Sequence, residues 1–283
     1  MNSIESFNYI KSIFDKNEPH LFFRLGLTEA KYMEGWLEPK NLSIIDDIMS
    51  FSGKHWLQCT GFFPPERKEV EKFLNYYENI ILDILKESQK VTYIPTRSSD
   101  KLLNIFNQNN CNVKELGFNP FYYFPNFQTL LKDKKICIVS CFPKTFLNQC
   151  DKLESIFLEK RLTNLNPKNI TFIKSPPHKF ICFDNENPYS SWFDAVDDLL
   201  EDITYSDYDI LLTSCGAFSL PLCHHAFKSN KIVMNMGGDL QILFGVKGKR
   251  WDNPSYKYNE YWVHPLPEET PKGVLRVEDG CYW

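Results

Sequence analysis

Two loops in the C-terminal half of the sequence combine glycine with small or polar residues directly before a predicted helix. One loop reads SCGAF and the other reads MGGDLQ. Loops of this kind let backbone N–H groups and a helix N-terminus approach a phosphate closely. Their glycines would also serve tight turns from strand to helix, so one such loop alone has two interpretations. Two in succession favour a phosphate-binding site, with the candidate residues Ser214, Gly216, Phe218, Gly237, Gly238 and Gln241.

A basic run, KGKRW, follows the second loop and the short helical segment after it. Lys249 and Arg250 are suited to neutralising a diphosphate, and Trp251 could stack on a sugar or a base. The same cations would also suit the C-terminal end of a helix without binding any ligand. The run therefore indicates a donor-binding segment only in combination with the two glycine loops.

Alternating apolar and amphipathic segments indicate the fold that positions these loops. The predicted strands are 21–25, 91–95, 134–143, 170–174, 207–216 and 230–238. The predicted helices are 4–14, one that opens at Thr28, 65–86, one capped by Ser98 and Ser99, 144–157, 190–203 and 217–228. Strands that alternate with helices predict an α/β fold with a doubly wound, mainly parallel, Rossmann-like sheet flanked by helices.

The carboxyl ends of the predicted strands select the loops in which a site is expected, because ligands of open α/β sheets bind there. Four loops meet this criterion: 26–29, 140–145, 213–219 and 236–241. They include the two glycine loops and add Gly26 and Ser140 to the candidate residues. They also place two carboxylates, Glu29 and Asp239, at the same edge of the sheet.

Length and composition predict one domain. The 283 residues fit a single α/β domain, 1–283, with an N-terminal half, 1–130, and a C-terminal half, 131–283, that meet near 125–134. The hydrophobic content of 43% is sufficient for a packed core. The formal net charge of -4 argues against a protein that binds the phosphate backbone of nucleic acid, so nucleic acid is not an expected partner.

The cysteines and the two ends of the sequence exclude further classes. Nine cysteines without a CxxC pair fit neither a disulfide framework nor a zinc site, and most are expected to be small buried side chains. The first residues lack the apolar core of a signal peptide, and no segment approaches the roughly 18 apolar residues of a membrane span. We expect a cytoplasmic protein. The terminal GCYW is either a tail docked into the core or an aromatic wall of a site.

Several enzyme classes lack their motifs here. There is no GxGxxG with an acidic ribose ligand and no GxxxxGK[ST], which argues against a Rossmann dehydrogenase and a P-loop enzyme. No serine lies in a GxSxG elbow, which argues against an α/β-hydrolase.

The motifs together resemble a family of glycosyltransferase-like proteins found in bacteria and in large algal viruses. The resemblance is carried by SCGAF and by the long run KIVMNMGGDLQILFGVKGKRWD, from Lys231 to Asp252. Further matching segments are RLGLTE, GFFP, VSCFPKTFLNQ and GCYW, so the resemblance spans nearly the whole chain. It implies the GT-D type of glycosyltransferase fold and a donor site that includes Arg24 and Gly26.

The sequence departs from the GT-D pattern at one position. That fold carries an R-x-G-D-G-E element, in which the Asp and the Glu form an acidic pair; here Leu27 stands at the Asp position and Glu29 keeps the Glu. The family implies Mn²⁺ or Mg²⁺ as a cofactor. Such cations want several oxygen ligands, so Leu27 in place of the Asp argues against firm binding of the metal. Without a metal to bind, Glu29 could serve as the general base, with Asp239 as its rival.

The viral members of the family imply a narrower activity. Like chlorovirus xylosyltransferases, the chain would transfer xylose from UDP-xylose to a sugar such as fucose on a capsid glycan, in the cytoplasm of the host. Its partners would be a nucleotide sugar and a glycan acceptor. We expect direct displacement with inversion, in which Lys249 and Arg250 hold the UDP leaving group.

Two alternatives stay open at the level of the sequence. The first is a noncatalytic nucleotide-sugar-binding module on the same fold, which Leu27 would favour. The second is another Rossmann-like transferase such as a methyltransferase, for which the KGKR run has no evident use.

Overall fold

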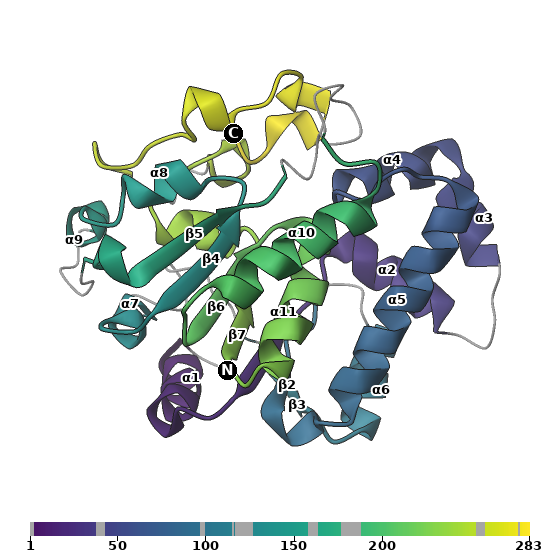
Figure 1. Ribbon diagram of the computed structural model, residues 1–283, viewed down its shortest axis with the longest axis horizontal. Coiled ribbons are helices and arrows are strands. Elements are labelled where there is room, and N and C mark those ends of the chain that lie inside the picture. The colour runs from purple at the N-terminus through teal and green to yellow at the C-terminus, as the bar shows by residue number, and fades with distance from the viewer. Residues whose placement is uncertain are drawn as a thin grey trace.

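A parallel sheet of seven strands organises the chain (Figure 1). The computed structural model describes residues 3–37, 43–96, 100–114, 116, 127–157, 164–176, 188–252, 258–276 and 278–283. The strand order is β3-β2-β1-β7-β6-β4-β5, and every neighbouring pair runs parallel. The strands are β1 (His20–Phe23), β2 (Val91–Tyr93), β3 (Asn112–Val113), β4 (Ile136–Ser140), β5 (Ile170–Lys174), β6 (Ile210–Ser214) and β7 (Ile232–Asn235). The predicted doubly wound α/β fold is confirmed.

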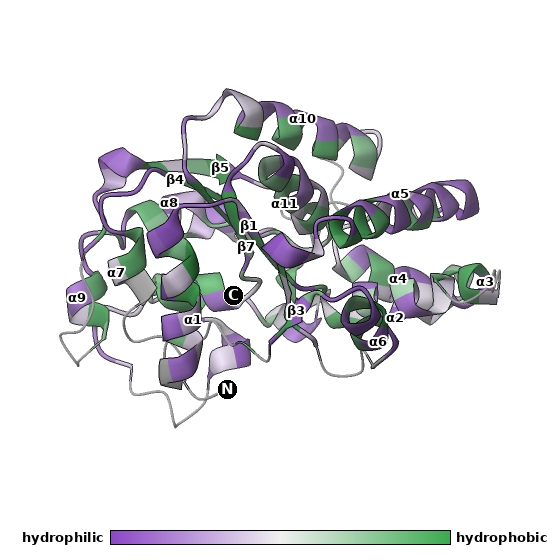
Figure 2. Cartoon of the chain, turned by 90° about the horizontal axis from the view of Figure 1, so that it is seen from below, coloured by the Kyte–Doolittle hydropathy of each residue, from purple (hydrophilic) through white to green (hydrophobic). Residues whose placement is uncertain are grey.

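Helices cover both faces of the sheet (Figure 2). One face packs against α2 (Leu27–Trp36), α3 (Ser43–Met49), α4 (Phe51–Cys59), α5 (Arg67–Leu85), α6 (Asp100–Gln108), α10 (Trp192–Tyr205) and α11 (Ser219–Lys228). The other face packs against α1 (Ser3–Lys16), α7 (Phe127–Leu131), α8 (Pro143–Leu147), α9 (Leu153–Ile156) and α12 (Asp239–Leu243).

The central strands β1, β7, β6 and β4 divide their side chains between these two cores. In β6, Leu211 packs on the face of α10 and α11, whereas Ile210 and Leu212 pack on the opposite face. Strand β1 divides in the same way, with Phe23 on the first face and Phe22 on the second. Because both faces are buried, the strands read as continuous apolar runs instead of an alternating pattern.

The predicted helix 144–157 is wrong. The segment forms two short helices, α8 and α9, with a turn between them. Tertiary hydrogen bonds hold this turn: Leu165 N–H donates to Cys150 O at 3.1 Å, and Gln149 Nε2 donates to Tyr261 O at 2.8 Å. Long-range partners therefore override the local helical pattern, which carries no information about them.

Other boundaries differ by smaller amounts. Helix α2 begins at Leu27 with Gly26 as its N-cap, one residue before the predicted opening at Thr28. Helices α3 and α4 and strand β3 were not predicted. The predicted caps Ser98 and Ser99, and part of the predicted boundary at 125–134, lie outside the described residues.

The cysteines and the helices of the described ranges show two further features. The eight cysteines in these ranges are buried and form no disulfide with one another. In the same ranges, no helix combines the length and the apolar character needed to cross a lipid bilayer.

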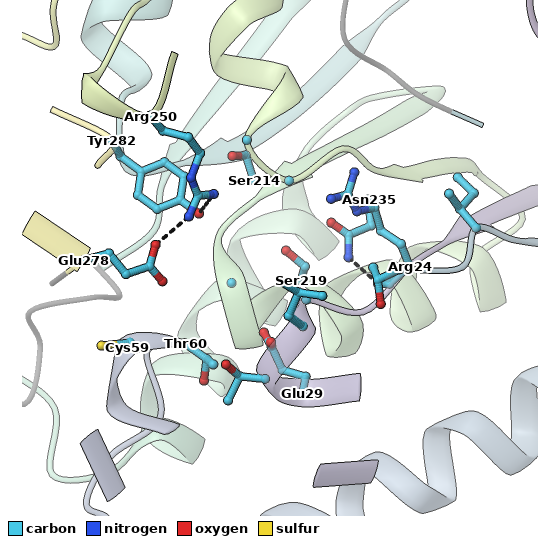
Figure 3. Close-up of a pocket in the computed structure, with 18 of the residues that line it drawn as sticks. Arg24, Glu29, Cys59, Thr60, Ser214, Ser219, Asn235, Arg250, Glu278 and Tyr282 are labelled. Carbon is cyan, nitrogen blue, oxygen red and sulfur yellow. Dashed lines mark hydrogen bonds and ion pairs between the residues drawn. The ribbon is translucent and has the colours of Figure 1, made fainter. Parts of the chain in front are cut away.

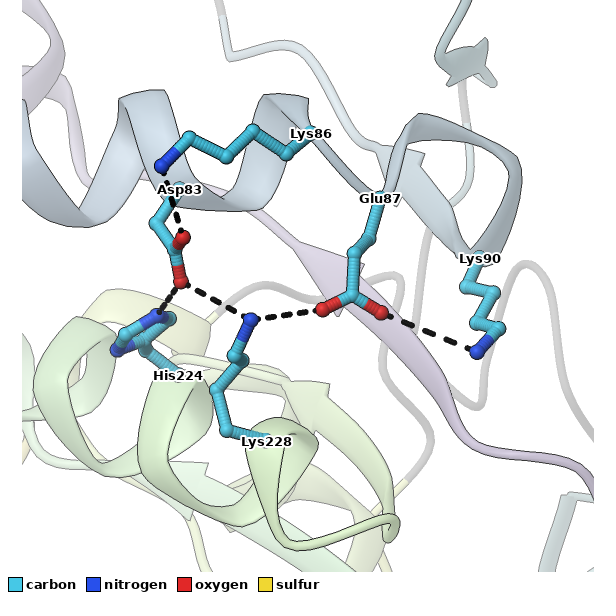
Figure 4. A network of polar contacts seen from close by, with 6 residues as sticks. All are labelled: Asp83, Lys86, Glu87, Lys90, His224 and Lys228. Atoms are coloured by element: carbon cyan, nitrogen blue, oxygen red, sulfur yellow. Dashed lines mark hydrogen bonds and ion pairs between the residues drawn. The ribbon is translucent and has the colours of Figure 1, made fainter.

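A polar network joins α5 to α11, the helix that follows the first glycine loop (Figure 4). Asp83 Oδ2 lies 2.9 Å from His224 Nε2 and 3.2 Å from Lys228 Nζ. Lys228 Nζ also lies 2.7 Å from Glu87 Oε1. The hydrogen bonds from His224 and Lys228 hold the pKa of Asp83 below its ordinary value of 3.8.

The variant Asp83→Asn is expected to lower the melting temperature at pH 7 by up to about two degrees. In the wild type, the Asp83 carboxylate has a lower pKa in the folded state than in the unfolded state. Its stabilising effect is therefore complete above about pH 4 and is lost as the pH falls further. The effect is roughly 1 kcal/mol or less, because the Asp83 side chain is 29% exposed and water screens the pair. Thermal unfolding of both proteins between pH 7 and pH 2 measures it. Asp15→Asn, at an exposed pair with Lys11, is the control. A difference that stays constant down to pH 2 would contradict the assignment.

Candidate functional site

A cavity of about 410 Å³ opens at the carboxyl edge of the sheet. Loops that follow β1, β2, β4, β6 and β7 line it. The chain runs from β1 to β2 toward one edge of the sheet and from β4 to β5 toward the other. Ligands of open α/β sheets bind where connections diverge in this way, and the volume is within the roughly 300–1,000 Å³ of small-molecule sites.

The structure brings most of the predicted site residues to this one cavity (Figure 3). All four strand-end loops selected from the sequence contribute to its wall. The predicted residues on the wall are Arg24, Gly26, Glu29, Ser214, Gly216, Gly237, Gly238 and Arg250. The N-terminal and C-terminal halves of the chain therefore share a single site.

Glu29 lies in the first turn of α2, with 6% of its surface exposed. Its carboxylate folds back over Gly26, where a Cβ atom would lie only 2.4 Å from Glu29 Oε2. A negative charge is favoured at this end of a helix. Burial, and then the charge of Glu29, raise the pKa of Tyr77 well above its ordinary value of 10. Tyr77 therefore stays protonated and donates to Ala217 O at 2.5 Å, which links α5 to the first glycine loop.

Arg24 follows β1 and faces the second glycine loop. Its Nη1 lies 3.4 Å from both Asp239 Oδ2 and Met236 O. Gly237 has a φ of 56°, a conformation that favours glycine, and a Cβ atom there would lie 3.4 Å from Arg24 Nη2. Asn235 Nδ2 donates to Arg24 O at 2.8 Å. Asp239, the rival base, thus faces a guanidinium and holds it at the cavity.

Arg250 reaches the cavity from the opposite wall. Its Nη1 donates to the Tyr282 hydroxyl at 2.6 Å, and its Nη2 lies 2.5 Å from Glu278 Oε2. The guanidinium carbon also lies 4.4 Å from the centre of the Tyr282 ring. The chain from Glu278 to Trp283, here called the C-terminal tail, thereby completes the wall of the cavity.

Both expectations for GCYW hold. Arg250 N–H donates to Cys281 O at 2.8 Å, and Gln241 Nε2 donates to Tyr282 O at 2.7 Å, so the tail is docked. The Trp283 ring packs edge-on against Phe142, with 5.6 Å between the ring centres. Tyr282 lines the cavity as an aromatic wall.

Two residues of the basic run have other contacts than those predicted. The ring of Trp251 is 6% exposed and packs against Gly238, where a Cβ atom would lie 2.8 Å from Trp251 Cζ2. The Trp251 ring is therefore packed inside the protein and does not offer the stacking surface predicted for a sugar or a base. Lys249 Nζ points toward Asp279 O at 3.5 Å, and of the run only Arg250 lies on the described wall of the cavity.

Three further predicted residues support the site from behind its wall. Phe218 is fully buried and stacks on Trp192, with 5.9 Å between ring centres. Ser140 is fully buried, and its hydroxyl accepts from Phe142 N–H at 3.3 Å. Gln241, also buried, holds the tail as described above. Their positions after strands are correct, but their side chains point into the core.

Several residues on the wall were not predicted. Asn235 is the last residue of β7. The strand-end rule would have included it if the predicted loop had begun one residue earlier, at 235 instead of 236. Cys59 and Thr60 come from the end of α4, and Glu278 comes from the part of the tail before GCYW. No sequence signal connects α4 or Glu278 to the edge of a sheet.

The donor set does not fit a divalent cation held by the protein. Leu27, at the position of the expected Asp, lines the cavity with an apolar side chain that is 62% exposed. Glu278 lies on the opposite wall, where it pairs with Arg250. The described residues contain no group of three or more His, Cys, Asp or Glu side chains arranged around a common point. Hard divalent cations want several oxygen ligands, more than these residues supply at one point.

Comparison with known proteins finds no family model that matches the chain, no similar curated protein and no similar solved structure. The residues of the cavity are therefore the basis for a functional proposal.

Proposed function

We propose that the chain is a glycosyltransferase that uses a nucleoside diphosphate sugar, with UDP-xylose as the first donor to test. One observation carries the proposal: a buried carboxylate, Glu29, shares a cavity with two arginines, Arg24 and Arg250. Guanidinium groups match phosphate oxygens, and a carboxylate can accept a proton from a hydroxyl. Gly216, Gly237 and Gly238 also line the cavity, and without side chains they let a phosphate approach the backbone closely.

The proposed reaction is a direct displacement with inversion. An acceptor hydroxyl oxygen bonds to the anomeric carbon while the bond from that carbon to the diphosphate oxygen breaks. The hydroxyl proton moves to Glu29, and the electron pair of the broken bond leaves with UDP. Arg24 and Arg250 stabilise the negative charge that develops on the leaving diphosphate. The cavity holds the two reactants together, which removes much of the entropic barrier.

A noncatalytic binding module is the second candidate, and Leu27 favours it. An exposed apolar side chain stands in the cavity where the GT-D resemblance expects a carboxylate. Such a module would bind the nucleotide sugar through the same arginines but would not turn it over.

Thermal unfolding in the presence of nucleotides tests the proposal. UDP and one or more UDP-sugars at about 100 times their dissociation constant are expected to add roughly 2.7 kcal/mol to the free energy of unfolding, a rise of several degrees. S-adenosylmethionine is expected to have no effect, and its stabilising the chain would favour a methyltransferase. No stabilisation by any uridine nucleotide would count against the proposal. Release of UDP from a stabilising UDP-sugar then separates the enzyme from the binding module.

A further inference from the structure

The pair of Arg250 and Glu278 places a carboxylate of the protein on the wall of a cavity that we assign to an anionic ligand (Figure 3). Glu278 Oε2 lies 2.5 Å from Arg250 Nη2, and both side chains line the cavity. The planar guanidinium group binds a carboxylate and a phosphate with the same geometry. Glu278 therefore occupies one of the positions from which a phosphate would bind Arg250.

Arg250 has contacts that do not involve Glu278. Its guanidinium lies over the Tyr282 ring at 4.4 Å, and its Nη1 donates to the Tyr282 hydroxyl at 2.6 Å. Its backbone N–H donates to Cys281 O at 2.8 Å. These contacts with Cys281 and Tyr282 hold the guanidinium of Arg250. An anion that replaces Glu278 therefore meets a guanidinium that is already in place.

Glu278 lies on backbone in an uncommon conformation, and its Oε2 also accepts from the Cys281 thiol at 3.0 Å. Both Glu278, with a φ of 46°, and Asp279, with a φ of 53°, adopt the left-handed region, which is unfavourable for residues other than glycine. A change at either dihedral angle moves the Glu278 carboxylate relative to Arg250. The residues from Cys281 to Trp283 remain anchored by their own hydrogen bonds.

We propose that Glu278 is an internal competitor for the anion subsite at Arg250 and thereby determines which ligands the cavity accepts. A ligand must present enough negative charge to displace a carboxylate from a guanidinium. A diphosphate meets this requirement better than a monophosphate, and a neutral sugar or nucleoside does not meet it. The inference rests on the proposed function in that it concerns the donor end of the same site.

Calorimetric titration of the full chain with UDP, inorganic pyrophosphate and uridine tests the proposal. Removing a competing carboxylate by Glu278→Gln is expected to tighten the binding of UDP and pyrophosphate by about two- to fivefold, the strength of a partly exposed ion pair. The affinity for uridine, which has no phosphate, is expected to stay unchanged. Asp279→Asn is the matched control, because it removes the same charge from the adjacent exposed residue and asparagine tolerates its φ. Glu278→Ser, which also lacks the carboxylate, must show the same gain.

The outcomes separate this inference from the proposed function. Equal affinity for UDP in the wild type and in both Glu278 variants overturns the inference and leaves the proposed function intact. Tighter pyrophosphate binding in the variants, without binding of UDP to any of them, supports the anion subsite and overturns the uridine nucleotide as its ligand. Weaker binding in both variants overturns the inference, since Glu278 would then contribute to the site instead of competing for it.

Discussion

Replacing Glu29 with glutamine is expected to lower the turnover of a UDP-sugar by about a hundredfold or more, with little change in the affinity for UDP. Glutamine has nearly the same shape and still fits over Gly26, but it cannot accept the proton of an acceptor hydroxyl. Steady-state rates with a UDP-sugar, together with calorimetric titration with UDP, measure the two effects separately. The melting temperature of the variant shows whether α2 remains folded.

Asp239→Asn distinguishes Glu29 from its rival. Asp239 lies beside Arg24 and holds its guanidinium at the cavity. Without the Asp239 carboxylate, the Arg24 guanidinium is less well positioned, and UDP binding is expected to weaken. If Asp239 is instead the base, its variant will lose turnover at saturating donor while Glu29→Gln keeps it. Wild-type turnover in Glu29→Gln would therefore remove Glu29 from the mechanism.

Arg24→Met is expected to weaken UDP binding by about tenfold to a hundredfold. The substitution removes a cation from the cavity wall while methionine retains much of the aliphatic volume. Hydrogen bonds to a charged group contribute roughly 1.5–3 kcal/mol, which corresponds to this range of affinity. Titration with UDP measures the loss, and a parallel titration with uridine should show almost none.

Lys249→Met provides the control for Arg24→Met. Lys249 is an exposed cation of the KGKRW run whose Nζ points to Asp279 O. Lys249 carries the same charge as Arg24 and is the sequence neighbour of Arg250. Because water and ions screen the Lys249 charge, the affinity of Lys249→Met for UDP is expected to change by less than about twofold at physiological salt. Equal losses in the two variants would mean that the overall charge matters and that Arg24 has no special position.

The fold could be predicted from the sequence because its strands are buried on both faces. Runs such as ICIVS and ILLTS are continuous and short, and a proline or glycine follows each within three residues, which indicates a buried strand. The predicted helix 144–157 failed because hydrogen bonds from Leu165 and to Tyr261 decide the turn within it. Contacts between residues far apart in the chain leave no local pattern.

The site could be predicted as far as strand ends define it. Arg24, Glu29 and Gly237 reach one cavity because parallel strands present their carboxyl ends at one edge. The direction of each side chain was less predictable, as Trp251 shows: the space beside Gly238 that suits a ligand is filled by its ring. Glu278 could not be anticipated, because its place depends on how the C-terminal tail docks.

The pairing of β1 with β7 has a consequence for the synthesis of the protein. These neighbours in the sheet come from opposite ends of the sequence, with Leu21 opposite Val233. While the ribosome elongates the chain, β1 can pair with β2 on one side but has an open edge on the other until β7 emerges. Such edges promote aggregation, and contacts this distant in sequence form slowly. Nascent chains that end before β7 are therefore expected to depend on chaperones.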